Sequence, residues 1–104
     1  MNDKDLYITI VMKEEKDMMR MPKPGEKILL KKDFMNEYDD EAIAAYNLHK
    51  VRFGYVANSV YTVARGTHSA GYIYRDLKDE GTARVCFSLE GKIIARILSS
   101  DHSD

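Results

Sequence analysis

Apolar residues occupy every second position in several short stretches of the chain, which is the pattern of strands with one buried face. The last two stretches flank Glu90 and Gly91, and this arrangement predicts a C-terminal hairpin with a tight turn. The alternation predicts about six short strands, at 6–12, 26–32, 42–47, 51–56, 83–89 and 93–98.

The spacing of apolar residues changes toward the helical period after residue 56. Asn58 or Ser59 can accept hydrogen bonds from the first turn of a helix. Gly66 suits the position after the last turn, where φ is positive. We therefore expect one short helix between these residues. A second short helix or turn is predicted over 69–77, with Ile73 and Leu77 on one face.

Length and composition fit one small globular domain. The chain has 104 residues, of which 44% are hydrophobic and 32% charged. Short strands with one or two helices between them predict a mostly antiparallel α+β fold, a small OB-like or SH3-like β-barrel. We expect the domain to span 1–104, with its core at about 5–98 and a frayed polar tail at 99–104.

Several classes of protein are disfavoured by the residues present. The N-terminus lacks the basic region of a secretory signal, and no stretch approaches the ~20 apolar residues of a membrane span. A single cysteine excludes an internal disulfide, and its place in an apolar strand predicts that Cys86 is an inert core thiol. The three histidines lack metal-ligand spacing. We expect a cytoplasmic protein with no cofactor, no metal and no catalytic residues.

Positive charge is concentrated in the middle of the chain, although the net charge is −1. Residues 42–78 hold five basic residues and one acid, and several tyrosines are interleaved with them. Such a pattern is typical of surfaces that follow a phosphate backbone, although the tyrosines suit half-buried barrel positions equally well. The basic residues are Lys50, Arg52, Arg65, Arg75 and Lys78.

The most specific stretch lies at 24–55 and contains NEYDDEAI at 36–43. Asn36 and Asp39 can each fold a side chain back onto the backbone, which would fix a turn that displays Tyr38. The run follows Gly25 and Glu26 and precedes a strand with Gly54 and Tyr55. This arrangement resembles the HIRAN domain, especially its short stand-alone bacterial members.

The resemblance implies an OB-like barrel that recognises single-stranded DNA, notably a free 3′ end. It implies that Tyr38 stacks on the terminal base and that Asp39 accepts a hydrogen bond from the terminal sugar hydroxyl. It implies further that Asn36 supports the turn. The basic and aromatic residues Lys50, Arg52, Tyr55 and Arg65 complete the expected nucleic-acid-binding set. The implied function is that of an accessory in DNA repair or processing, beside a partner protein that supplies helicase or nuclease activity.

The chain departs from the family pattern at two points. Glu37 replaces a proline, and the region VMKEEKDMM at 11–19 lacks the arginine and aromatic residues of DNA-end-binding members. These departures support an alternative, a protein-interaction module that keeps the barrel and has lost the DNA-end pocket. The methionines at 18, 19 and 21 would then serve as a soft binding patch or as a flap over one end of the barrel.

Overall fold

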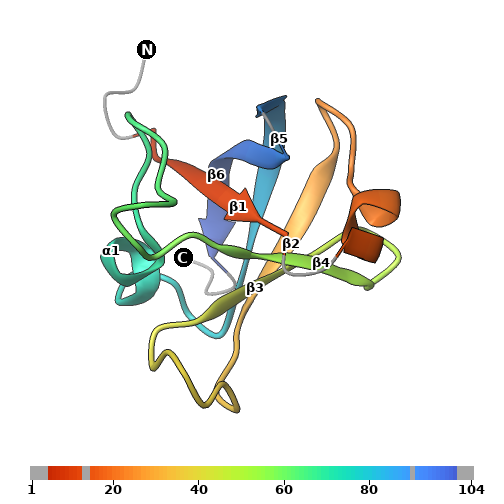
Figure 1. Ribbon diagram of the computed structural model, residues 1–104. Coiled ribbons are helices and arrows are strands. Elements are labelled where there is room, and N and C mark those ends of the chain that lie inside the picture. The colour runs from red at the N-terminus through yellow and green to blue at the C-terminus, as the bar shows by residue number, and fades with distance from the viewer. Residues whose placement is uncertain (1–4, 13–14, 90, 101–104) are drawn as a thin grey trace.

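The chain forms a closed antiparallel β-barrel. The computed structural model describes residues 5–12, 15–89 and 91–100, and within them lie six strands, one α-helix and one 3-10 helix (Figure 1). Around the barrel the strands follow the order β1, β4, β3, β2, β5, β6. The elements are β1 (Tyr7–Val11), η1 (Glu15–Arg20), β2 (Lys27–Lys32), β3 (Ile43–Tyr46), β4 (Arg52–Val56), α1 (Ala70–Tyr74), β5 (Glu80–Leu89) and β6 (Lys92–Ser100).

The predicted fold class and each predicted strand are confirmed. Alternate residues of the strands point into the barrel and bury their side chains, as the period of two requires. Phe53 is the largest of the fully buried side chains. Branched residues from every strand surround it in one contiguous core, among them Ile8, Ile28, Ile43, Val85 and Ile93.

The prediction of a helix after Asn58 or Ser59 is wrong. Ser59 accepts hydrogen bonds at its carbonyl from the backbone of Thr62 and Val63, which closes a single turn. The backbone N–H groups that follow bind β1 instead: that of Ala64 donates to Thr9 Oγ1 at 3.0 Å, and that of His68 donates to the Tyr7 carbonyl at 2.7 Å. The segment 57–68 therefore covers the outer face of β1.

The second predicted helix is confirmed as α1. Ser69 is its N-cap and accepts a hydrogen bond at Oγ from the backbone N–H of Tyr72 at 3.2 Å. Ile73 and Leu77 are both buried, on the face that packs against the barrel. This short helix therefore closes one end of the core.

The predicted C-terminal hairpin is confirmed, but the predicted burial of Cys86 is wrong. A β-bulge between Val85 and Phe87 places Cys86 as an extra residue in β5, and its thiol is exposed. The prediction of a core thiol was wrong because Cys86 follows the buried Val85 and therefore points away from the core. The bulge also leaves the next residue, Phe87, half exposed. Strand β6 continues to Ser100, and the rest of the predicted tail, 101–104, lies outside the described residues.

Candidate nucleic-acid pocket

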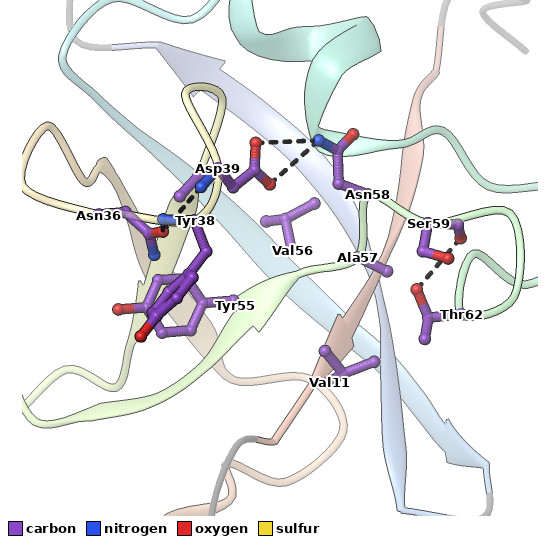
Figure 2. A pocket seen from close by; sticks show the side chains of 11 residues that line it. Val11, Asn36, Tyr38, Asp39, Tyr55, Val56, Ala57, Asn58, Ser59 and Thr62 are labelled. Carbon is purple, nitrogen blue, oxygen red and sulfur yellow. Dashed lines mark hydrogen bonds between the residues drawn. The ribbon is translucent and has the colours of Figure 1, made fainter.

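The loop between β2 and β3 is held by a side chain that binds its own backbone. Asn36 Oδ1 accepts hydrogen bonds from the backbone N–H groups of Tyr38 at 2.8 Å and Asp39 at 2.9 Å (Figure 2). The predicted turn is therefore present. The side chain of Tyr38 is 94% exposed on this turn, whose backbone Asn36 holds.

Asp39 ties this loop to the segment that precedes α1. Its Oδ1 accepts from the backbone N–H of Glu41 at 2.9 Å, and its Oδ2 accepts from Asn58 Nδ2 at 3.1 Å. Asn58 Oδ1 in turn accepts from the backbone N–H of Gly71 at 2.8 Å. One chain of hydrogen bonds thus runs from the loop through Asn58 to α1. Its link between Asn58 and Asp39 fixes the orientation of the Asp39 carboxylate (Figure 2).

A cavity of about 360 Å³ lies between these segments, and we call it the end pocket. Tyr38 and Asp39 line it on the loop side, Val11 lines it from β1, and Tyr55 lines it from β4 (Figure 2). Its remaining lining residues are Asn36, Ala42, Val56, Ala57, Asn58, Ser59 and Thr62. The pocket therefore joins an exposed aromatic ring, an apolar floor and an oriented carboxylate.

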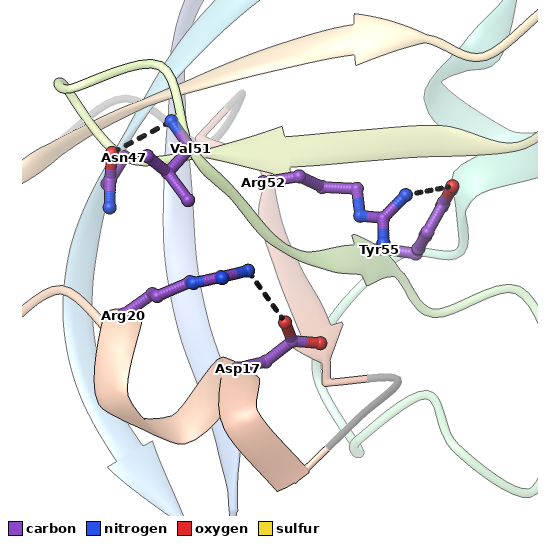
Figure 3. A network of polar contacts seen from close by, with 6 residues as sticks. All are labelled: Asp17, Arg20, Asn47, Val51, Arg52 and Tyr55. Carbon is purple, nitrogen blue, oxygen red and sulfur yellow. Dashed lines mark hydrogen bonds and ion pairs between the residues drawn. The ribbon is translucent and has the colours of Figure 1, made fainter.

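Tyr55 connects the end pocket to a charged pair. Its hydroxyl donates to Asp33 Oδ2 at 2.8 Å, and Arg52 Nη1 donates to that hydroxyl at 3.4 Å. The Arg52 guanidinium also lies 5.4 Å from the centre of the Tyr55 ring (Figure 3). Burial and the hydrogen bond to Asp33 raise the pKa of Tyr55 above its usual value.

The structure brings only some of the sequence-predicted residues together. Asn36, Tyr38, Asp39 and Tyr55 line the end pocket, and Arg52 lies beside it through Tyr55. Lys50 lies in the turn between β3 and β4, which contributes no lining residue to the pocket.

The remaining basic residues of the middle segment lie in other places. Arg65 lines a separate cavity with His68 and Tyr72, whose rings stack at 4.2 Å. Arg75 is the C-cap residue of α1 and is exposed, as is Lys78. The basic middle segment therefore does not form one surface.

Two residues that contribute to the end pocket were not predicted from the sequence. Asn58 was considered only as a helix cap, and its bond to Asp39 joins residues 19 positions apart. Lys92 begins β6 and donates from Nζ to the Thr62 carbonyl at 3.3 Å, which places a cation beside the lining of the end pocket. No local pattern marks either residue, because both contacts depend on how distant segments meet in the barrel.

The loop itself is strongly acidic. Positions 33–41 hold Asp33, Glu37, Asp39, Asp40 and Glu41 and no basic residue. Within the described part of the chain, no three side chains of the metal-binding types gather in one place. Nor does this part contain a helix with the length and apolarity to cross a membrane. Comparison of the chain with protein-family models, curated proteins and solved structures found no match.

Proposed function

We propose that this barrel is a nucleic-acid-binding module that takes the free 3′ end of a single strand, most naturally DNA, into the end pocket. The observation that carries the proposal is the pairing of Tyr38 with Asp39: a fully presented ring and an oriented carboxylate line one cavity. The resemblance of NEYDDEAI to the HIRAN pattern supports the same assignment.

Tyr38 supplies the stacking surface. Asn36 already fixes its backbone, so only the side-chain torsions of Tyr38 lose conformational freedom when a base stacks on the ring. Stacking of one base on an aromatic side chain contributes about 1–3 kcal/mol and is largely independent of sequence. Binding at this position is therefore expected to tolerate any base.

Asp39 supplies the discrimination between a strand end and a strand interior. An ionised carboxylate has about four lone-pair sites, and among the described residues Oδ2 of Asp39 accepts a hydrogen bond only from the Asn58 amide. A terminal hydroxyl can donate to this oxygen. An internal phosphodiester has no proton to donate and would bring a negative charge toward Asp39 and its acidic neighbours.

Arg52 and Lys92 flank the end pocket and are suited to the phosphate that precedes the last nucleotide. The acidic loop disfavours additional phosphates on its own side. The proposed role is accordingly that of an accessory in DNA repair or processing, in which a partner protein performs the helicase or nuclease reaction.

Fluorescence anisotropy at low and moderate salt tests the proposal. Three probes of the same single strand are compared, with a free 3′ hydroxyl, a 3′ phosphate or a 5′ phosphate. We expect only the 3′ phosphate to weaken binding. Tyr38→Ala should also weaken binding, whereas Tyr61→Ala should not, because Tyr61 is 90% exposed but does not line the end pocket. Equal affinity for all three probes would refute end recognition.

A protein-interaction function is the second candidate, and two apolar side chains favour it. Phe34 is 67% exposed and Met35 is 86% exposed, and neither lines the end pocket. Exposed apolar side chains of this size on one loop are typical of a binding surface. Failure of every nucleic-acid probe to bind at low salt would leave this function as the better account.

A further inference from the structure

A second cavity, of about 400 Å³, lies near the other end of β4, and we call it the basic groove. Its lining includes the cations Arg20, Lys23 and Lys27 and one carboxylate, that of Glu26. Glu26 Oε1 accepts a hydrogen bond from the backbone N–H of Lys23 at 2.8 Å, so this acid is partly engaged. Because Arg20 is paired with Asp17, the positive excess in the groove comes from Lys23 and Lys27, which outnumber Glu26.

Lys50 adds a cation beside the basic groove at a conformational cost. It follows Leu48 and His49, which line the groove, and its φ of 67° lies in the region that favours glycine. Asn47 braces the turn by accepting hydrogen bonds at Oδ1 from the backbone of His49 at 2.9 Å and of Val51 at 3.1 Å. A φ in this region is uncommon for a residue other than glycine, and the side chain of Lys50 is exposed there.

Arg52 links the basic groove to the end pocket. It precedes Tyr55 by three residues, about 10 Å along an extended strand, and its guanidinium reaches the Tyr55 hydroxyl. Helix η1 packs against β4 and carries Arg20, which pairs with the buried Asp17 at 3.7 Å (Figure 3). Along β4, Arg52 therefore stands between the turn whose first residues line the groove and Tyr55, which lines the end pocket.

We propose that the basic groove holds phosphates of the nucleotides that precede the strand end, so that a bound strand runs from the end pocket over Arg52 to Lys23, Lys27 and Lys50. This inference rests on the proposed function. Positive charge and the link through Arg52 favour a nucleic-acid strand over an acidic protein segment as the occupant. OB folds that bind single strands, which are also small β-barrels, cover about 4–16 nucleotides each, which is consistent with two connected sites.

The test compares a thymidine trinucleotide with a thymidine decanucleotide, each with a free 3′ hydroxyl and a 5′ fluorophore. We expect the intact chain to bind the decanucleotide at least about tenfold more tightly. Lys23→Glu should remove most of this gain, leave trinucleotide binding unchanged, and reduce the salt slope of log K by about 0.7 for each lost phosphate contact. Lys78→Glu is the control, because it changes the same charge at an exposed position outside both cavities.

Lys50→Gly separates binding from stability. Glycine adopts a φ of 67° without strain, so we expect an unchanged or higher unfolding temperature together with weaker decanucleotide binding. Equal affinity for both lengths would overturn the inference and leave the proposed function intact. Equal effects of Lys23→Glu and Lys78→Glu on decanucleotide affinity would also overturn the inference. That result is expected if the groove instead binds an acidic protein segment. Failure of both probes to bind would overturn the inference together with the proposed function.

Discussion

At the scale of single residues, a few side-chain amides and carboxylates hold the candidate site in place. Asn36 binds two backbone N–H groups of its own loop, and Asn58 joins that loop to α1. The first contact is local, so the residue types of NEYDDEAI were sufficient to predict the turn. The second depends on the approach of a distant segment, and no pattern around Asn58 could predict it.

Asn58→Ala should lower both stability and affinity. The change removes the donor to Asp39 Oδ2 and the acceptor of the Gly71 N–H, and the two partly buried groups lose their protein partners. Loss of such bonds costs about 1–3 kcal/mol of unfolding free energy, measured by urea denaturation. Ser88→Ala, an exposed change in β5, is the control. An unchanged free energy would show that the bonds from Asn58 do not stabilise the loop.

Tyr55 makes stability depend on pH in the alkaline range. Its folded-state pKa is raised above the unfolded value near 10, chiefly by burial and then by Asp33. Between these values the unfolded chain binds fewer protons than the folded chain. The contribution of Tyr55 is therefore fully present below pH 10 and is lost as pH rises through the folded pKa. Urea unfolding at pH 8 and above pH 10 should show a steeper loss in the intact chain than in Tyr55→Phe. Identical slopes would contradict this.

At the scale of elements, the strands were predictable because a period of two is a local property of the sequence. The conformation of the segment after residue 57 could not be predicted in this way, because its N–H groups bind β1 instead of forming successive helical turns. The prediction for Cys86 failed at a bulge, which is a property of how β5 pairs with β6. Each failure lies where pairing between distant segments decided the structure.

The contact between β1 and β4 should not tolerate a side chain at position 54. A Cβ on Gly54 would overlap the carbonyl oxygen of Val11, which is backbone and cannot move without breaking the pairing of the two strands. Gly54→Ala should lose about 1–3 kcal/mol of unfolding free energy.

Gly71→Ala is the matched comparison for this change. The nearest atom to its added Cβ is the end of the Glu41 side chain, which can rotate away. It should therefore cost less than Gly54→Ala in the same urea denaturation. Equal losses would contradict the argument from the β1 backbone.

The N-cap of α1, Ser69, makes a smaller contribution to the free energy of unfolding. Ser69→Ala removes the acceptor of the Tyr72 N–H and should cost about 1 kcal/mol of unfolding free energy. Ser69→Asp should restore most of it, because a carboxylate caps the same group. The thermal unfolding midpoints of the three chains test this order, and a full loss in both variants would assign another role to Ser69.

At the scale of the whole molecule, charge is divided between two regions. The loop at 33–41 is acidic, whereas the basic groove near the other end of β4 is lined mainly by cations. The net charge of −1 conceals this division. Only the fold shows that Lys23 and Lys27 from the start of the chain lie beside the turn that carries Lys50, because the sequence suggested a basic segment at 42–78 alone.

The most direct test of the central claim is an NMR titration of the isotope-labelled chain with a thymidine trinucleotide that carries a free 3′ hydroxyl. The account predicts that the backbone signals of Tyr38 and Asp39 and the side-chain amide of Asn58 shift together, and that a 3′ phosphate on the same probe abolishes the Asn58 shift. Signals that do not move, or that move only at residues outside the end pocket, would contradict the claim that this pocket receives a strand end.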